Sequence, residues 1–502
     1  MGMPERSEVP EGWARVPLID IVGDKSDIVG GPFGSNLKVK DYQNEGIPII
    51  RLQNVGFGEF IDKDIKFLSI KKANELKYHS FKSGDLVLAK LGTPIGKTCQ
   101  IPEKYSWGIV TSDVVRIRIQ NEMLDKRYLL HFLNSSRSLA QLNNQIFGTT
   151  RPRVNLKEVR DVLISFPPLP EQHRIVAAIE ALFARLDAAN VHLERVPGIL
   201  KQFRQSVLAA ACDGRLTEDW RQTSAVFECE ADYIVPSRVI LNHKESSPVF
   251  SRSEQKDLPY MWRYATFGSL GDWKSGATPS KSNPDFWTNG QISWVSPKDM
   301  KTEAIADSID HITMEAVEKT NLHILPEDSL IFVVRGMILA KDFPVALTER
   351  EVTINQDMRA LIPNDCVYPR YLLRALQNQA HNILRVVRSS THGTKRLESP
   401  TLKSWPIALP PLPEQHEIVR RVDALFALAD KIEAEVAAAR EKTGTMRQSI
   451  LAQAFSGRLV PTEAELARQE GRAYEPASVL LERIRLEKKE KKGRNGIQST
   501  LV

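Results

Sequence analysis

Short loops rich in glycine and hydroxyl side chains are the residues of this chain best suited to binding chemistry. One covers residues 30–36, Gly-Gly-Pro-Phe-Gly-Ser-Asn, and a second covers residues 275–281, Ser-Gly-Ala-Thr-Pro-Ser-Lys. Backbone N–H groups and short hydroxyls in such loops can approach phosphate oxygens, while Arg, Lys, Asn and Gln can bond to base edges. The loops predict contacts to a nucleic acid; simple turns without a ligand are the alternative.

Two further loops are basic and recur before long apolar-patterned segments: residues 149–153, Thr-Thr-Arg-Pro-Arg, and residues 391–396, ending Lys-Arg. Recurrence at corresponding places favours a binding role over a plain turn. Together with basic residues in or near β-rich runs, the candidate nucleic-acid contacts are Gly31, Ser35, Asn36, Arg51, Lys90, Thr149, Thr150, Arg151, Arg153, Thr278, Ser280, Lys281, Lys298, Arg335, Thr391, Lys395 and Arg396.

Motifs for catalysis and metal binding do not stand out. The chain has no Walker A loop, no GxSxG and no HExxH, and its four cysteines form no CxxC pair. Residues 283–287, Asn-Pro-Asp-Phe-Trp, only faintly resemble the loop that amino-methyltransferases place against a flipped base. We therefore predict no catalytic residues, no metal site, free thiols and a chain that is not itself an enzyme.

Composition is that of an ordinary soluble protein with room for two to four domains. The 502 residues are 42% hydrophobic and 26% charged, with a formal charge of +6 that permits a polyanionic partner without requiring one. The start has no signal-like apolar region, and no run of eighteen apolar residues occurs, so we expect a cytoplasmic protein without a membrane span.

An internal repeat organises the chain. The heptapeptide Pro-Pro-Leu-Pro-Glu-Gln-His at residues 167–173 returns at residues 410–416, a shift of 243 positions. The match continues beyond the heptapeptide: about 23 of the 50 residues from 167 to 216 are identical to their counterparts from 410 to 459. This repeat indicates two equivalent halves.

Each copy of the heptapeptide opens a segment with heptad periodicity. Apolar residues recur at alternating steps of four and three, which predicts a coiled-coil helix of about 40 residues, or about 60 Å. A single apolar stripe would indicate a globular core, but two stripes in one register favour pairing with each other. Pro197, Gly198 and Gly444 predict a kink or break in these helices.

The segments before the helices mix short β-rich runs with helical patterns, so the fold class is α/β (α+β) with two long helices. We expect globular domains at 12–160 and 259–405, helical repeats at 167–216 and 410–459, and a polar linker at 217–258. Residues 460–502 form a charged tail in which a helix near residues 483–492 runs into disorder.

These features together resemble the specificity (S) subunit of Type I restriction-modification enzymes. The resemblance covers nearly the whole chain and includes both Pro-Leu-Pro-Glu-Gln segments, the Gly-Arg-Leu ends at 214–216 and 457–459, and Glu-Pro-Ala-Ser-Val-Leu-Leu at 475–481. It implies two target-recognition domains, each reading one half of an asymmetric, bipartite site on double-stranded DNA. The two helices would pair antiparallel as a pseudo-twofold spacer.

The resemblance also implies partners. Methyltransferase (M) subunits would dock on the helical region, and restriction/translocase (R) subunits would join the assembly, so that S-adenosylmethionine, ATP and Mg belong to partner subunits. The docking residues it suggests are Glu171, Gln172, His173, Glu414, Gln415 and His416. The alternative is a non-catalytic scaffold or adaptor that uses the paired helices without reading DNA, and a free-standing enzyme is a weaker third reading.

Overall fold

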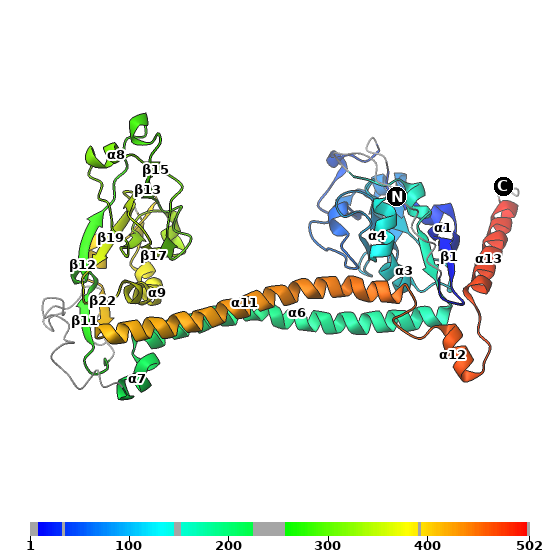
Figure 1. The fold of residues 1–502 in the computed structure, drawn as a ribbon. Coiled ribbons are helices and arrows are strands. Elements are labelled where there is room, and N and C mark those ends of the chain that lie inside the picture. The colour runs from blue at the N-terminus through cyan, green and yellow to red at the C-terminus, as the bar shows by residue number, and fades with distance from the viewer. Residues whose placement is uncertain (1–8, 33–35, 145–151, 224–256, 390–392, 499–502) are drawn as a thin grey trace. The chain divides into compact units, whose positions relative to one another are not determined.

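The computed structural model describes residues 9–32, 36–144, 152–223, 257–389 and 393–498, with side chains described to residue 489. The chain divides into two compact units: unit 1 contains residues 1–194 and 438–502, and unit 2 contains residues 195–437. Each unit therefore holds one globular domain together with a portion of each of two long helices (Figure 1).

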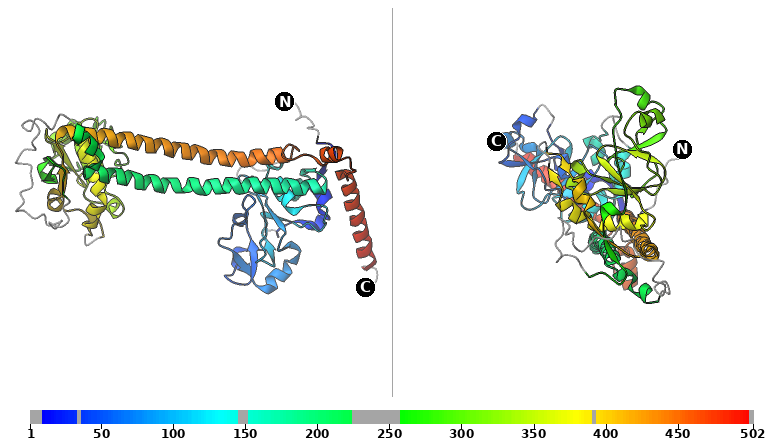
Figure 2. Two further views of the ribbon diagram at one scale, coloured as in Figure 1. Left: turned by 90° about the horizontal axis from the view of Figure 1, so that it is seen from below. Right: turned by 90° about the vertical axis from the view of Figure 1, so that its left-hand side faces the viewer.

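The long helices are α6 (Leu169–Cys212) and α11 (Leu412–Ala454). They lie side by side and antiparallel (Figure 2), as predicted. In unit 1, Arg447 of α11 forms an ion pair with Asp187 of α6. In unit 2, Arg204 of α6 pairs with Asp430 of α11 at 2.5 Å. Each residue of the second pair lies 243 positions from its equivalent in the first, so the repeat forms the same contact twice.

Of the predicted kink or break, the break is wrong, because α6 continues through Pro197 and α11 through Gly444, and the kink stays a prediction. Proline has no N–H, so the carbonyl of Leu193, four residues earlier, loses its helical hydrogen bond. The guanidinium of Arg440 on α11 donates to this carbonyl at 3.0 Å. The neighbouring helix thus satisfies the group that the proline leaves unpaired.

Domain 1, in unit 1, is built on two four-stranded sheets. The first has the strand order β2 (Ile28–Gly30), β9 (Val114–Ile117), β6 (Leu86–Ala89), β7 (Thr98–Gln100), and the second has the order β4 (Lys66–Leu68), β3 (Ile47–Ile50), β8 (Trp107–Val110), β5 (Ser80–Lys82). The helices of this domain are α1 (Leu18–Val22), α2 (Ile70–Glu75), α3 (Lys126–Leu133), α4 (Ser136–Asn143) and α5 (Leu156–Arg160). Only the β3–β8 pair is parallel among the strand pairs of the described residues in this domain.

Domain 2, in unit 2, has a related topology, with one strand more in its larger sheet and one fewer in its smaller sheet; the added edge strand runs parallel to its neighbour. Its larger sheet has the order β12 (Gly271–Ser275), β19 (Met358–Pro363), β16 (Leu330–Val333), β17 (Val345–Thr348), β14 (Ala304–Ile305), and its smaller sheet has the order β15 (His311–Ile312), β13 (Ile292–Val295), β18 (Val352–Ile354). The remaining elements are the hairpin β20 (Arg388–Ser389) and β21 (Lys395–Arg396), with helices α8 (Met314–Glu318), α9 (Pro369–Arg385) and α10 (Ser399–Lys403). The parallel pair β13–β18 corresponds to β3–β8, which confirms that the two domains share one fold.

Burial explains the central strands. All four residues of β6, Leu-Val-Leu-Ala, and all four of β16, Leu-Ile-Phe-Val, are buried. A strand with both faces covered reads as a continuous apolar run rather than an alternating one. These two strands are therefore the rigid elements from which the loops that follow them project.

Each domain is closed by a pair of antiparallel strands at the base of its long helix. In unit 1, β1 (Ala14–Pro17) pairs with β10 (Leu163–Phe166), and in unit 2, β11 (Arg263–Thr266) pairs with β22 (Pro406–Leu409). The strands β10 and β22 lie just beyond the predicted domain ranges 12–160 and 259–405. They lead directly into α6 and α11.

A tryptophan and a buried glutamate hold each domain to its helix. The indole N–H of Trp13 donates to Glu171 in the first turn of α6 at 2.8 Å, and that of Trp262 donates to Glu414 of α11 at the same distance. The second carboxylate oxygen of Glu171 accepts the backbone N–H of Glu463 at 2.9 Å. We call each such pair the Trp–Glu clasp.

The clasp of unit 2 has additional charged support. The other oxygen of Glu414 accepts hydrogen bonds from the Thr217 hydroxyl at 2.7 Å and from the Arg221 guanidinium at 2.5 Å. Both donors follow the end of α6. Glu414, in the first turn of α11, therefore also holds the segment that follows the end of α6.

The glutamine after each glutamate completes the attachment. Gln172 accepts the N–H of Asp125 at 2.9 Å, and Gln415 accepts the N–H of Tyr368 at 2.7 Å. Each side-chain amide also donates to the first proline carbonyl of its own heptapeptide, Pro167 or Pro410.

This arrangement corrects the predicted docking residues. Glu171, Gln172, Glu414 and Gln415 are fully buried and bonded within their own units, so these side chains cannot contact another subunit directly. The histidines that follow them, His173 and His416, are exposed, and a docking role for them stays a prediction.

The described part of the C-terminal segment is not a free tail. It contains α12 (Glu463–Glu470) and α13 (Ala477–Gln498). Ala477, Leu480, Leu481 and Ile484 are buried in the core of domain 1. The charged residues that suggested a solvated tail lie on the other faces of a helix whose apolar stripe completes unit 1.

Replacing Leu480 tests whether α13 is part of the domain 1 core. Leu480 is 2% exposed, so Leu480→Ala should lower the stability of unit 1 by about 2–5 kcal/mol in urea unfolding. The matched control is Leu486→Ala on the same helix, where the side chain is 59% exposed and the loss should stay within about 0.5 kcal/mol. Equal effects of the two substitutions would contradict the packing of α13.

The clasp of unit 1 predicts a pH-dependent stability. Burial raises the pKa of Glu171 to about 6, above the value of about 4.3 for an exposed glutamate. The folded state therefore favours the neutral acid, and stability falls as pH rises through this interval. Glu171→Gln cannot ionise, so the stability advantage of the parent over this variant should be larger at about pH 5 than at about pH 7.5 in urea unfolding. A stability difference between the parent and Glu171→Gln that does not change with pH would contradict the raised pKa of Glu171.

Candidate nucleic-acid interface

In domain 1, three segments meet where β6 ends. The N–H of Lys90 donates to the carbonyl of Asp113 at 3.0 Å, and the carbonyl of Lys90 accepts the N–H of Val154 at 3.0 Å. A bridge between Leu91 and Arg153 brings the basic loop into the same place. We call Lys90, Asp113 and Arg153 basic centre 1.

The electrostatics of basic centre 1 show that its charges interact. Burial lowers the pKa of Lys90, the positive charge of Arg153 lowers it further, and the carboxylate of Asp113 opposes both effects. A half-buried ammonium beside another cation is stabilised by any anion that approaches.

Domain 2 repeats this arrangement where β16 ends. The N–H groups of Val334 and Arg335 donate to the carbonyl of Asp357 at 2.8 and 3.1 Å, and the carbonyl of Val334 accepts the N–H of Leu397 at 2.9 Å. A bridge joins Arg335 to Arg396. The structure thus forms the same backbone contacts as in domain 1.

Three guanidinium groups and one aspartate lie close enough to interact here. Burial lowers the pKa of Arg359, the positive charges of Arg335 and Arg396 lower it further, and Asp357 opposes them. Arg335 lies 3.8 Å from Asp357, and Arg396 lies 3.2 Å from Glu398. We call Arg335, Asp357, Arg359 and Arg396 basic centre 2.

The glycine-rich loops begin at these centres. A Cβ atom on Gly31 would overlap the backbone of Thr111, and one on Gly276 would overlap the carbonyl of Asn355. Thr111 and Asn355 each precede the aspartate of a basic centre by two positions. Only glycine allows the loop to pass so close to the chain at these points.

The structure brings together some of the predicted contacts and separates others. Gly31, Lys90 and Arg153 meet in domain 1, and Arg335, Lys395 and Arg396 meet in domain 2. Asn36, Ser280 and Lys281 are exposed, and Thr278 is half-buried on the same loop as the latter two. The remaining predicted residues, Ser35, Thr149, Thr150, Arg151 and Thr391, lie outside the described residues.

Two of the other predicted cations have acidic partners, as Arg335 and Arg396 do in basic centre 2. Arg51 forms an ion pair with Asp64 at 3.0 Å, and Lys298 lies 2.7 Å from Asp310. Hydrogen bonds from Arg51, Lys66 and Gln53 lower the pKa of Asp64 to about 2. A new contact from either cation would compete with its present ion pair.

Sequence reasoning missed three members of the basic centres: Asp113, Asp357 and Arg359. The two aspartates lie 244 positions apart, one residue out of register with the main repeat, because the segment after them, up to Arg127 or Arg370, is one residue longer in domain 1. A search that allowed this offset would have found them. Arg359 follows Met358 at the start of a strand and carries no repeated signal.

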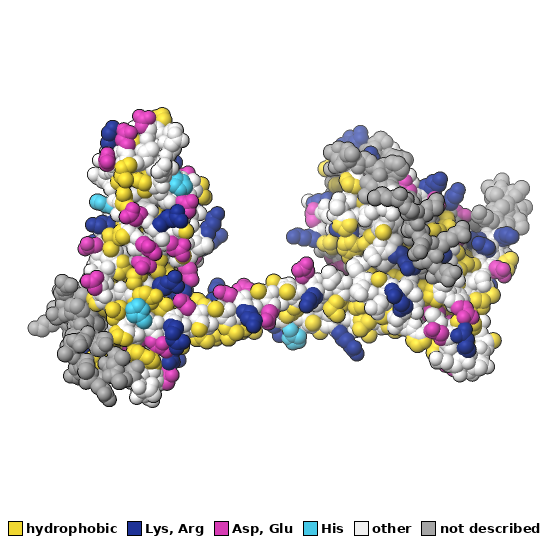
Figure 3. All heavy atoms as spheres, viewed as in Figure 1, with side chains coloured by type: hydrophobic (Ala, Val, Ile, Leu, Met, Phe, Trp, Pro, Cys, Tyr) yellow, Lys and Arg dark blue, Asp and Glu magenta, His cyan; other side chains and the backbone are white. Residues whose placement is uncertain are grey.

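Neither sign of charge gathers on one part of the face drawn in Figure 3. In the view of Figure 3, acidic and basic side chains are interspersed on both domains and along the helices. The overall excess of six positive charges therefore says less about where a nucleic acid would bind than the positions of particular cations do.

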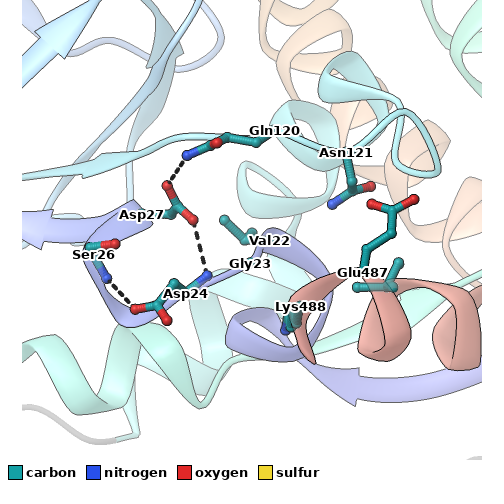
Figure 4. Close-up of a pocket in the computed structure, with 10 residues that line it drawn as sticks. Val22, Gly23, Asp24, Ser26, Asp27, Gln120, Asn121, Glu487 and Lys488 are labelled. Atoms are coloured by element: carbon teal, nitrogen blue, oxygen red, sulfur yellow. Dashed lines mark hydrogen bonds between the residues drawn. The ribbon is translucent and has the colours of Figure 1, made fainter. Parts of the chain in front are cut away.

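A small cavity beside α13 competes as a candidate site (Figure 4). It has a volume of about 200 Å³ and is lined mainly by polar residues of domain 1 and α13. Gln120 donates to Asp27 at 2.6 Å, and the ammonium of Lys488 donates to the carbonyls of Ile19 and Asp20. Because the Lys488 bonds join α13 to domain 1, the cavity belongs to the packing of the C-terminal helix.

Metal and membrane sites have no support among the described residues. Within those ranges, no three side chains of the His, Cys, Asp and Glu types come together in a way that could hold a metal ion. Nor does any helix in the described part of the chain have the length and apolarity needed to cross a bilayer.

Comparisons with known proteins agree with this architecture. The specificity subunit of the Type I restriction enzyme StySPI from Salmonella potsdam is 26% identical over 503 residues, covering 96% of this chain and 97% of that one. The EcoR124I/EcoR124II specificity subunit from Escherichia coli is 37% identical over 169 residues, covering 34% of this chain and 42% of that one.

A solved structure concerned with complex assembly and conformational transition of the type I R-M system matches the fold. Its TM-score is 0.60 at 19% identity, and the match covers 90% of this chain and 99% of that one.

The family described as Type I restriction modification DNA specificity domain matches residues 10–195 and 259–438. These two stretches contain both globular domains, both Trp–Glu clasps and the beginnings of both long helices. The chain therefore belongs to the Type I restriction-modification DNA specificity family.

Proposed function

We propose that domain 1 and domain 2 each read one half of a bipartite DNA site, with the basic centre of each domain on the DNA backbone. The observation that carries this proposal is the recurrence of the centres: the same backbone contacts form after a buried strand in both domains, and they place Arg153 and Arg396 at equivalent positions. Phosphate contacts of this kind fix the register of a protein on a duplex. The loops around the centres differ between the domains, as two unlike half-sites require.

The long helices would set the distance between the two half-sites. A pair of helices with repeated ion pairs in each unit is stiff against changes of length, and in other DNA-binding proteins the geometry between two reading elements fixes the half-site spacing. The contact between Arg440 and the Leu193 carbonyl supports this role, because it keeps α6 helical through its proline.

Catalysis would belong to other subunits of the complex. We propose that methyltransferase subunits dock on the helical region, that restriction/translocase subunits join them, and that S-adenosylmethionine, ATP and Mg bind to those partners. The exposed histidines His173 and His416 stay candidates for such docking. Support comes from the family membership and from the similar solved structure, which concerns assembly of a type I R-M system.

Salt dependence tests the role of basic centre 2. Arg335→Ala and Arg396→Ala in the full-length chain should each weaken binding to duplex DNA and reduce the slope of log K against log salt by about one. The control is Lys319→Ala, because Lys319 is an exposed cation that pairs with Glu315 in α8.

The outcome also separates DNA reading from a pure scaffold. Parallel salt slopes for the parent and both arginine variants would remove basic centre 2 from the interface. A parent chain that assembles with its partners, yet gives a complex without affinity for duplex DNA, would favour the scaffold.

Helix length tests the spacer. Deleting one heptad from each helix, residues 188–194 of α6 and the facing residues 440–446 of α11, shortens the pair by about 10 Å, which corresponds to about three base pairs. The preferred spacer should shorten by about this amount in a selection from duplexes with varied spacing. Deletion from α6 alone should disrupt pairing instead. An unchanged spacer preference with full binding would show that the helices do not set the distance between the half-sites.

A further inference from the structure

A short apolar turn projects beside basic centre 2. It is the 3₁₀ turn Met337–Ala340, which lies between β16 and β17 and follows Gly336. Met337 is 65% exposed and Ile338 is 40% exposed, whereas Leu339 is 2% exposed. We call Met337 and Ile338 the apolar tip.

The tip is held in a defined conformation. Gly336 has φ 134°, a value that side chains rarely adopt, and its N–H donates to the Lys395 carbonyl at 3.0 Å. On the other side, the N–H groups of Lys341 and Asp342 both donate to the Ile338 carbonyl at 2.9 Å. With Leu339 buried in the core, the turn presents its two apolar side chains outward from a fixed base.

Cations surround the tip. Arg335 lies two residues before Met337, Lys341 lies three residues after Ile338, and the bond from Gly336 to Lys395 brings the hairpin that contains Arg396 alongside. Exposed large apolar side chains cost solvation free energy unless a partner covers them. An apolar centre framed by cations matches a partner with a charged backbone and apolar surfaces between the charges.

Domain 1 shows that the fold does not require this exposure. Its corresponding loop, residues 90–97 between β6 and β7, buries Ile95 completely and exposes Thr93 and Pro94. The two loops follow equivalent strands and adjoin equivalent basic centres. The apolar tip is therefore particular to domain 2.

We infer that Met337 and Ile338 contact bases of the half-site read by domain 2, while the surrounding cations contact phosphates. This inference rests on the proposed function and adds a residue-level determinant of recognition to it. Apolar side chains contact DNA by packing on thymine methyl groups or by entering between base steps, and methionine and isoleucine suit both contacts. The contribution of the tip to the affinity for DNA would not depend on salt concentration, because the contact is apolar.

The double variant Met337→Ala/Ile338→Ala separates this role from that of the cations. In the full-length chain, we expect the Kd for duplex DNA to rise about tenfold or more, with the slope of log K against log salt unchanged. The slope stays because no phosphate contact is lost. Replacing Met337 with Leu and Ile338 with Val keeps the apolar surface and should restore most of the affinity.

The matched control is Ile309→Ala/Met314→Ala, because these side chains are 64% and 52% exposed and lie near the smaller sheet of domain 2. This control should bind within about twofold of the parent. Parent-like binding by the tip variant, or equal losses in tip and control variants, would overturn the inference. So would a tip variant that fails to assemble with methyltransferase subunits in the absence of DNA, since the tip would then face protein.

Failure of the proposed function gives a different result. If the parent chain and its complex do not bind duplex DNA, the proposed function fails and the inference fails with it. If the parent binds and the arginine variants weaken binding while the tip variant does not, only the inference fails.

Discussion

The indole-to-carboxylate hydrogen bond between the start of each domain and the first turn of each long helix is the contact on which the rest of the structure depends. Trp13 and Trp262 donate to Glu171 and Glu414, which are fully buried. A buried carboxylate without donors would be costly, so the surrounding groups must stay in place. The same carboxylates bind the segments that follow α6 and α11, and so join three parts of each unit.

This attachment divides the molecule into constant and variable parts. The clasps, the closing strands and the helical ion pairs recur in both units with nearly the same geometry. The loops that follow β6 and β16 differ in length, charge and apolarity, although they project from equivalent strands. A fixed attachment with changeable loops suits a protein whose two domains must present different surfaces to one DNA molecule.

Much of the architecture could be predicted from the sequence, because repetition and heptad spacing are local signals. The shift of 243 residues identified two equivalent domains, and the alternating steps of four and three identified two long helices with matching apolar seams. Their antiparallel pairing was implied by the family resemblance. The break at Pro197 was wrong because its remedy, the guanidinium of Arg440, comes from the other helix. The heptapeptide gave no sign that its Glu and Gln would be buried rather than exposed, since that depends on Trp13 and Trp262 far away in the chain.

The candidate site was less accessible to sequence reasoning. Lys90, Arg153, Arg335 and Arg396 were predicted from basic loops, but Asp113, Asp357 and Arg359 join them only through strand pairing. The apolar tip looked like ordinary core sequence until its exposure was known. Charge–charge proximity and exposure of this kind come from tertiary packing, which a single sequence does not encode in any short window.

The most direct test of the central claim, that each domain reads its own half-site through its basic centre, is hydroxyl-radical footprinting of the assembled complex on its DNA target. The parent should protect two separated segments. Lys90→Ala/Arg153→Ala should lose protection mainly at one segment and Arg335→Ala/Arg396→Ala mainly at the other. Equal loss at both segments with either variant, or undiminished protection with both, would contradict the account.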